Sequence, residues 1–274
     1  MIHLKTFDTI VDSINRIKSL RKGYVTNFFK TEKELSTYIK KNKVLFSVIN
    51  ESFFLLIDNN SIYNLFYIST SPVRLSHDLY LLTKTGYSKP LVADIVTKDR
   101  VPIVKKVFEE TNFLQYAILI RMSRLKYDPI FSLESNPHVN LASEEQSEEI
   151  LKILNTNFDQ KSEQLPDLVQ ILEWIKRNGI YTYIHEGKIF GLIIFEVIGI
   201  TLNLRYWFVN PEFRDRKIGS ILFKYFLYSG KETKRQLFWV MKSNENAIKR
   251  YKHFGFKEED LFNYVMIYKQ KYEK

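Results

Sequence analysis

The sequence contains no cysteine among its 274 residues. This absence excludes disulfide bonds, thiolate metal sites and cysteine nucleophiles, and it makes a cytoplasmic location the simplest expectation. The five histidines are scattered without the spacing of metal ligands, so no metal site is predicted. The sequence contains no G-x-S-x-G segment, the usual signature of a serine hydrolase with a nucleophile elbow, so this class is not indicated.

The sequence also lacks a hydrophobic run long enough to cross a bilayer. Its longest apolar stretch, IFGLIIFEVIGI, is interrupted by Glu196 and is shorter than the roughly 20 residues of a membrane-spanning helix. The opening segment, MIHLKTFDTIVDSI, does not have the pattern of a secretory signal peptide. We therefore expect a soluble protein without a membrane partner.

The composition provides enough apolar surface for a large folded core. Hydrophobic residues make up 45% of the chain and aromatic residues 15%, which excludes a disordered protein. The formal net charge is +10, but acidic residues are interspersed along almost every basic segment. This pattern favours a mixed, solvated surface over a nucleic-acid partner, while a local basic cluster is still compatible with a phosphate-rich cofactor.

The hydrophobic pattern predicts that one order of elements occurs twice along the chain. In each half, two helices are followed by three strands, a helix, a strand, a helix and a last strand. Residues 125–138 contain two prolines and little periodicity, which is typical of a linker. We predict an α/β fold with mixed sheets in two similar domains, residues 1–126 and 138–274, joined by a linker at 127–137. The alternative is a single C-terminal domain that follows an unrelated N-terminal half.

Two segments of the C-terminal half resemble the motifs of the GNAT acetyltransferases. The first, VNPEFRDRKIGSILF (209–223), reads as the end of a strand, a basic loop with one glycine and the start of an apolar helix. The second, SNENAIKRYKHFGF (243–256), begins another helix, and a strand separates the two. The turn HEGKIFGLIIFE (185–196) is similar to a hairpin of that family. The resemblance covers about residues 138–270 and implies an acyl-CoA N-acyltransferase fold.

The resemblance also implies a binding site for acetyl-CoA. In this family the loop before the helix wraps the pyrophosphate, because helix N-terminal amides and the helix dipole favour an anion. The preceding strand would pair its backbone with the pantetheine arm. The residues assigned to the cofactor in this way are Phe208, Val209, Arg214, Arg216, Lys217, Ile218, Gly219, Ser220, Asn244 and Ala247.

Tyr251 matches the family tyrosine that lies near the thioester sulfur and protonates the departing thiolate. The sequence departs from the family pattern at two positions. Lys217 replaces the first glycine of the loop, where a β-carbon restricts φ but an ammonium can pair with phosphate. Asn203 stands where many relatives have a glutamate base, and Glu196 on the preceding strand is the nearest carboxylate and the candidate base. A mechanism without a dedicated base, with water passing the proton onward, is the other possibility.

The N-terminal half lacks the motifs of this site. The strand SIYNLFYIST is followed by SPVRLSHDL without a glycine-containing loop, and Phe108 aligns with Tyr251. We predict a degenerate GNAT-like repeat that does not bind CoA in the same way. Its expected roles are to complete the packing and to form one wall of the acceptor site.

The resemblance implies an N-acetyltransferase that moves an acetyl group from acetyl-CoA to a primary amine by direct attack. The acceptor would be a small molecule or a peptide, and a tandem pair favours a monomer. Two alternatives are open. A non-catalytic GNAT-like binding module would consume no thioester with any amine. An aminoacyl-tRNA-dependent transferase of similar fold would bind charged tRNA in place of CoA.

Overall fold

The chain folds into two compact units. The computed structural model describes residues 1–20, 23–100, 102–125 and 133–269. Unit 1 consists of residues 1–120, 241–243 and 260–269, and unit 2 of residues 121–240 and 244–259. Residues 127–132 of the predicted linker lie outside the described residues.

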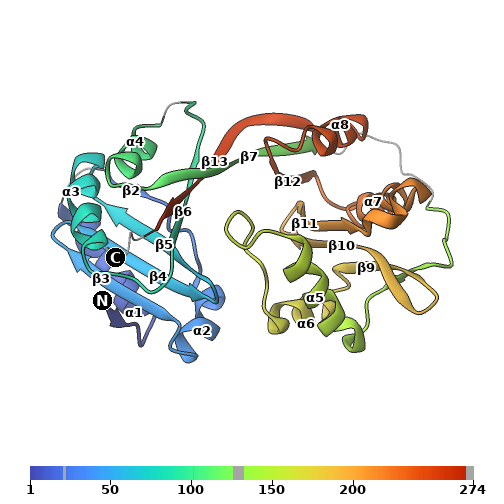
Figure 1. Cartoon of the computed structure of the whole chain (residues 1–274), viewed down its shortest axis with the longest axis horizontal. Helices are drawn as coiled ribbons and strands as arrows, with labels where there is room; N and C mark the ends of the chain where they lie inside the picture. The colour runs from blue at the N-terminus through green and yellow to red at the C-terminus, as the bar shows by residue number, and fades with distance from the viewer. Residues whose placement is uncertain (21–22, 101, 126–132, 270–274) are drawn as a thin grey trace, which may run out of the picture. The chain divides into compact units, whose positions relative to one another are not determined.

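Strands β7 (Leu114–Leu125) and β13 (Lys257–Tyr268) each contribute residues to both units (Figure 1). The predicted division followed the order of the chain and assigned everything after residue 138 to the second domain. The structure differs at the C-terminus, because β13 pairs antiparallel with β6 (Leu91–Thr97) from Phe262 to Tyr268. The last strand thereby completes the sheet of unit 1.

Unit 1 has a central sheet with helices on both faces. Strands β3, β4 and β5 are antiparallel neighbours, and β5 runs parallel to β6. Alternate residues of β4 face opposite sides, so Phe53 and Leu55 pack with α1 and α2, and Phe54 and Leu56 pack with α3 and α4. The elements before β7 are β1 (Ile2–His3), α1 (Asp8–Leu20), β2 (Val25–Thr26), α2 (Glu32–Lys40), β3 (Val44–Ile49), β4 (Ser52–Asn59), β5 (Ile62–Ser69), α3 (Pro72–Thr83), β6 and α4 (Ile103–Glu110).

Unit 2 repeats this plan. Strands β8 to β11 are antiparallel neighbours, and β11 runs parallel to β12. Helices α5 and α6 pack on one face of the sheet, where Ile150, Ile171 and Trp174 meet Leu192 and Ile194. The elements are β8 (Val139–Leu141), the 3-10 turn η1 (Glu144–Gln146), α5 (Ser147–Asn157), α6 (Leu168–Lys176), β9 (Ile180–His185), β10 (Lys188–Ile198), β11 (Thr201–Val209), the 3-10 turn η2 (Pro211–Arg216), α7 (Ile218–Ser229), β12 (Arg235–Met241) and α8 (Glu245–His253).

The order of elements predicted from the sequence is present in both halves of the chain. The two units also share a detail of pairing, because their parallel contacts are very short. In unit 1 only Tyr63 and Asn64 of β5 pair with β6, and in unit 2 only Thr201 to Asn203 of β11 pair with β12. Beyond these residues the third and fourth strands of each unit are no longer in register.

Turns in this glycine-poor chain rely on asparagine. Among the described residues, seven non-glycine positions have a positive φ, and five of these are Asn42, Asn50, Asn60, Asn112 and Asn178. Asparagine tolerates the left-handed conformation better than most residues. The other two are Glu186, at the β9–β10 turn, and Lys217.

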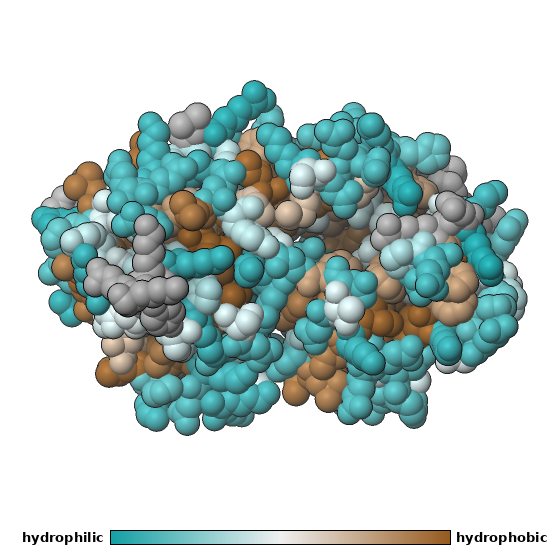
Figure 2. All heavy atoms as spheres, in the orientation of Figure 1, coloured by the Kyte–Doolittle hydropathy of each residue, from teal (hydrophilic) through white to brown (hydrophobic). Residues whose placement is uncertain are grey.

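The exposed face of each unit shown in Figure 2 is mostly hydrophilic, with scattered apolar side chains. Such scattered exposure is usual for folded proteins. In the described part of the chain, no helix combines the length and hydropathy that crossing a bilayer requires.

Candidate functional site

The edge of β11 that faces β12 loses its pairing partner after Asn203. At this point β11 contains an extra residue, Arg205, because Phe195 of β10 pairs with Leu204 and Ile194 pairs with Tyr206. A bulge of this kind increases the local twist and ends the regular ladder. Residues 206–209 therefore present backbone N–H and C=O groups that are not in register with β12. An edge of this kind can bind an extended ligand through main-chain hydrogen bonds.

The loop after β11 is held by polar and aromatic contacts. The side chain of Asn210 accepts a hydrogen bond from the amide of Glu212 at 3.1 Å. The Phe213 ring stacks on Phe190 of β10, with centroids 4.0 Å apart and planes 14° from parallel. The guanidinium of Arg216 lies 5.0 Å from the centre of the Phe213 ring. The loop is thus fixed by packing, which compensates for its shortage of glycine.

Lys217 has φ +60° and ψ +9° and immediately precedes α7. This is the left-handed conformation that glycine adopts without strain, which gives a physical reason for the family glycine at this position. A β-carbon therefore does not prevent the turn, although it carries strain. The exposed Lys217 side chain makes no capping hydrogen bond to the helix.

The first turn of α7 provides the amides expected to face an anion. The Ile221 amide donates to the Lys217 carbonyl at 3.0 Å, and the amides before Ile221 belong to the first turn, where a helix offers its N–H groups no partner of its own. Ser220 is exposed, whereas the Ile218 side chain is buried and offers only its backbone. Of the other predicted cofactor residues, Arg214 has its backbone in η2, and its side chain lies outside the described part.

Gly219 allows α7 to pack closely on β11. A β-carbon at this position would lie 3.1 Å from the Trp207 ring and 3.4 Å from Val209. The indole nitrogen of Trp207 is buried and has no hydrogen-bond partner in the described part of the chain. An unsatisfied buried donor is uncommon in folded proteins and is often found where a ligand or water completes the site.

Tyr251 lies on α8 within the same aromatic cluster. Its ring is 4.1 Å from that of Phe238 and 5.6 Å from that of Trp207, between centroids. Burial raises the pKa of Tyr251 far above the ordinary value; the charge of Glu163 raises it further, and Arg250 lowers it. The hydroxyl is therefore protonated throughout the neutral range and can act as a hydrogen-bond donor.

Asn244 and Ala247 form the cap of α8. The Asn244 side chain accepts a hydrogen bond from the Ala247 amide at 3.1 Å, so this asparagine orders the helix that carries Tyr251. The structure shows no other hydrogen bond from the Asn244 side chain to the described residues, which leaves its amide group available to a ligand.

The candidate base Glu196 faces Asn203 across the β10–β11 pairing. Its carboxylate accepts a hydrogen bond from Arg205 Nε at 2.6 Å, so it is engaged by the residue that forms the bulge. A second carboxylate of interest is Glu163, which the sequence analysis did not identify as a candidate. It lies in the irregular loop between α5 and α6, where no motif or periodicity marks it. Burial and the nearby Asp159 raise the pKa of Glu163 to about 7.

The corresponding edge of β5 in unit 1 is occupied by the chain itself. Val25 and Thr26 of β2 pair with Ser69 and Ile68 of β5. The side chain of Asn27 then accepts from the Tyr67 amide at 2.8 Å and donates to the carbonyls of Leu65 and Asp94 at 3.0 and 3.2 Å. This short segment fills the place that a ligand could take on β11. In addition, Phe108 packs on Tyr67 at 5.5 Å between ring centroids and offers no hydroxyl.

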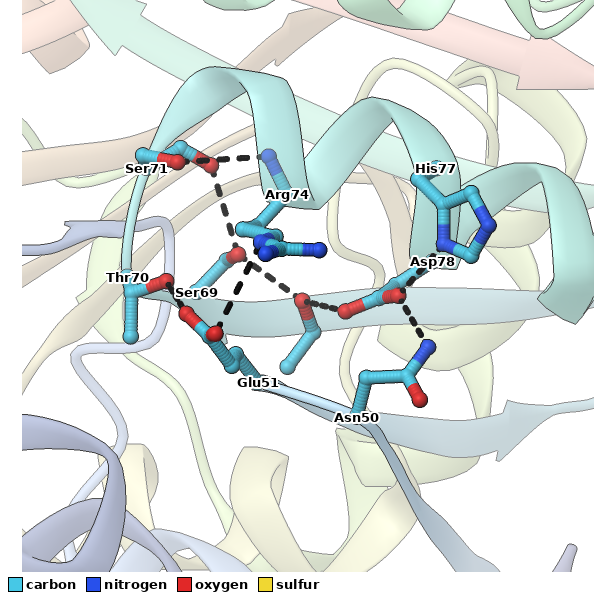
Figure 3. Close-up of polar contacts among 9 residues, drawn as sticks. Asn50, Glu51, Ser69, Thr70, Ser71, Arg74, His77 and Asp78 are labelled. Atoms are coloured by element: carbon cyan, nitrogen blue, oxygen red, sulfur yellow. Dashed lines mark hydrogen bonds and ion pairs between the residues drawn. The ribbon is translucent and has the colours of Figure 1, made fainter. Parts of the chain in front are cut away.

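The N-terminus of α3 is likewise closed by the protein's own side chains (Figure 3). Only Thr70 and Ser71 separate β5 from α3, and the Ser71 hydroxyl accepts from the Arg74 amide at 3.2 Å. One turn further on, the fully buried Asp78 accepts from Ser52 Oγ at 2.7 Å. Asp78 also accepts from the Asn50 side chain at 2.8 Å and lies 3.1 Å from His77 Nδ1. Arg74 itself pairs with Glu51. The polar groups at the start of α3 thus bond one another, whereas no side chain caps the start of α7.

Comparisons with known proteins agree with this geometry. Residues 147–256 match the Acetyltransferase (GNAT) family. A GCN5-related N-acetyltransferase from Sphaerobacter thermophilus has a similar structure, with a TM-score of 0.59 and 9% identity over 79% of this chain and 76% of that one. One from Kribbella flavida has a TM-score of 0.56 and 12% identity over 89% and 98%. A tandem GNAT protein from the clavulanic acid biosynthesis pathway has a TM-score of 0.53 and 13% identity over 82% of each chain.

No curated protein matches the sequence. Within the described residues, no group of three or more histidine, aspartate or glutamate side chains is arranged to hold a metal ion. The structural likeness extends across both units, and the family match covers the segment that contains β11, α7 and α8. The chain therefore has the fold of the GNAT acetyltransferases, and its residues 147–256 belong to that family.

Proposed function

We propose that the chain is an N-acetyltransferase that transfers the acetyl group of acetyl-CoA to a primary amine of a small molecule or a peptide. Membership of residues 147–256 in the GNAT family supports acyl transfer as the class of reaction. The observation that carries the proposal is the meeting of three features around Trp207. These are the unpaired edge of β11, the start of α7 at Gly219 and the hydroxyl-bearing ring of Tyr251.

Acetyl-CoA would supply an activated thioester, and the residues of unit 2 fit its chemistry. The backbone of Phe208 and Val209 would hold the amide groups of the pantetheine arm. The amides of residues 218–220, with the side chains of Arg214, Arg216 and Lys217, would hold the pyrophosphate. Asn244 and Ala247 would contact the cofactor at the start of α8. The unpartnered Trp207 N–H supports this assignment, because a bound carbonyl would satisfy it.

The protein's contribution to the reaction would be alignment and proton supply. The amine attacks the thioester carbonyl directly, and backbone amides near Val209 support the negative charge that develops on oxygen. Tyr251 donates its hydroxyl proton to the departing sulfur. Because burial raises the pKa of Tyr251, a free tyrosinate is not stable there, so its proton must be replaced promptly.

We infer that unit 1 does not bind CoA, because β2 and Asn27 fill the edge of β5. The prediction is one molecule of acetyl-CoA per chain. We further propose that the protein acts as a monomer in the cytoplasm. The tandem arrangement supports the monomer, and the lack of cysteine supports the cytoplasmic location.

Isothermal titration with acetyl-CoA, followed by an assay of thiol release with a panel of primary amines, tests the proposal. We expect a stoichiometry of one and thiol release with at least one amine. No binding at millimolar acetyl-CoA would overturn the proposal, and retention of charged tRNA in its place would support a tRNA-dependent transferase. Binding without thiol release for any amine would identify a binding module.

Tyr251→Phe tests the role of the hydroxyl. The aromatic packing is retained, so acetyl-CoA binding should be unchanged while turnover falls about 10²-fold, the usual contribution of a general acid. Tyr228→Phe, on the last turn of α7, is the matched control and should leave turnover unchanged. Equal turnover in the Tyr251 variant and the wild type would remove the tyrosine from the mechanism.

A further inference from the structure

We propose that Glu163 is the general base that accepts the proton of the acceptor amine during acyl transfer; this inference rests on the proposed function. The assignment comes from the way the loop between α5 and α6 is attached to β11. Sequence reasoning expected the base on β10 at Glu196.

The loop of residues 158–164 is fixed to β11 directly after the bulge at Arg205. The hydroxyl of Tyr206 donates to the carbonyl of Gln164 at 2.6 Å. The Phe158 ring meets the Tyr206 ring edge to face, with centroids 5.2 Å apart. Glu163, next to Gln164, is therefore held at the stretch of β11 where the ligand edge begins.

The loop has its own internal support, which leaves the Glu163 carboxylate without a structural task. Asp159 accepts from the amide and the hydroxyl of Ser162 at 3.2 and 2.8 Å, and its carbonyl accepts from the Glu163 amide at 2.9 Å. The described residues provide no hydrogen bond and no ion pair to the Glu163 carboxylate. By contrast, Glu196 is neutralised by Arg205.

The Glu163 loop and the Tyr251 ring contact neighbouring residues of β11. Successive side chains of a strand point to opposite faces. Tyr206 holds the Glu163 loop, and the next residue, Trp207, packs against Tyr251. Glu163 and Tyr251 are also close enough for the glutamate charge to raise the pKa of the tyrosine. A proton acceptor and a proton donor are thus both attached to the stretch of β11 assigned to the thioester.

Glu163 and Tyr251 together account for the two proton transfers of the reaction. The amine nitrogen forms a bond with the carbonyl carbon and loses a proton to Glu163, while the carbon–sulfur bond breaks and its electron pair leaves with sulfur. Tyr251 gives a proton to that sulfur. Transfer of the proton from Glu163 back to Tyr251 through solvent restores both groups, and the products are an amide and a free thiol.

The surroundings of Glu163 bring the pKa of its carboxyl into the range that a general base needs. Two titratable groups interact with it electrostatically, Asp159 from its own loop and Tyr251 from α8. Burial and the Asp159 charge raise the pKa of Glu163 to about 7. A base is most effective when its pKa lies near the operating pH, and the raised pKa brings Glu163 into that range.

Glu163→Gln tests the proposal through both kinetics and titration. We expect kcat to fall about 10²- to 10³-fold with little change in the KM for acetyl-CoA. The acidic limb of the wild-type pH–rate profile near pH 7 should disappear. In the free protein, carboxyl carbon NMR should show one glutamate titrating near pH 7 that is missing in the variant. Glu173→Gln, on the exposed face of α6, is the matched control and should alter none of these readouts.

The outcomes separate the base from the overall function. If the wild type releases thiol and Glu163→Gln keeps both its turnover and its acidic limb, the assignment of Glu163 is wrong. Loss of the limb in Glu196→Gln alone would also overturn it, as would an ordinary titration of the Glu163 carboxyl. If the wild type binds no acetyl-CoA, the proposed function fails, and the base fails with it.

Discussion

Replacing Glu163 by glutamine should make unit 2 more stable above pH 7. The pKa of this carboxyl rises from its ordinary 4.5 to about 7 on folding, because of burial and Asp159. Between these values the folded protein holds a proton that the unfolded chain has released, so wild-type stability falls as pH rises through this window. The window spans about 2.5 pH units at about 1.4 kcal/mol each. The loss is therefore about 3 kcal/mol, reduced to about 2 to 3 by the partial exposure of the residue.

The glutamine side chain does not titrate, so the variant avoids this loss. Its free energy of unfolding should equal that of the wild type near pH 4 and exceed it by about 2 to 3 kcal/mol at pH 8. Denaturant unfolding followed by tryptophan fluorescence measures this difference, since all three tryptophans, Trp174, Trp207 and Trp239, lie in unit 2. Glu173→Gln, on the exposed face of α6, controls for the loss of one surface carboxylate.

A Glu163→Gln variant that is less stable than the wild type at pH 8 would refute this reasoning. The same holds for a difference that stays constant from pH 4 to pH 8. Either result would mean that a favourable partner compensates the buried charge in the folded state. The carboxylate would then have a structural role, and its assignment as the general base would lose its physical basis.

Three further substitutions test other parts of the description. Lys217→Gly should raise the free energy of unfolding by about 0.5 to 1 kcal/mol, because relief of about 1–2 kcal/mol of left-handed strain exceeds the entropy that glycine adds to the unfolded chain. Titration calorimetry should also show CoA binding that is severalfold weaker. Glu186→Gly, at the other strained position that is not an asparagine, is the control and should change stability alone. Gly219→Ala should weaken CoA binding, since its β-carbon would lie 3.1 Å from the Trp207 ring and would displace that ring; binding equal to that of the wild type would contradict the close packing. Asn27→Ala removes three hydrogen bonds and should destabilise unit 1 by about 2–3 kcal/mol. Faster amide hydrogen exchange in β5, with unchanged tryptophan-reported unfolding, would show this effect, and unchanged exchange would contradict it.

The parts of the fold that depend on local pattern could be predicted from the sequence. Helix α2 (Glu32–Lys40) follows a capping box in which Thr31 and Glu34, close to each other in the sequence, bond each other, so its start depends on a local pattern. The order of strands and helices around residues 209–223 and 243–256 also agrees with the structure. The sequence alone does not show whether a lysine can replace the family glycine at position 217. The structure shows that Lys217 adopts the left-handed backbone conformation that the turn requires.

The remaining features depend on contacts between distant residues. Strand β2 has only two residues, so it has no periodicity to recognise, yet it and Asn27 close the edge of β5. Glu163 owes its raised pKa to a loop whose position is set by Tyr206, more than 40 residues away along the chain. The bulge at Arg205 follows from pairing with β10 and is likewise invisible in a single strand.

The assignment of β13 to both units has a consequence for the order in which the protein is completed during synthesis. Unit 2 has all its residues once position 259 has emerged, whereas unit 1, although it comes first in the chain, still lacks the strand that pairs with β6. Domains usually fold in the order in which they are made. Here the edge of β6 must wait about 170 residues for its partner, and such distant pairings form slowly. The N-terminal unit is the last to be finished, and until then β6 has an unpaired edge that is open to misassembly on a ribosome-bound or truncated chain.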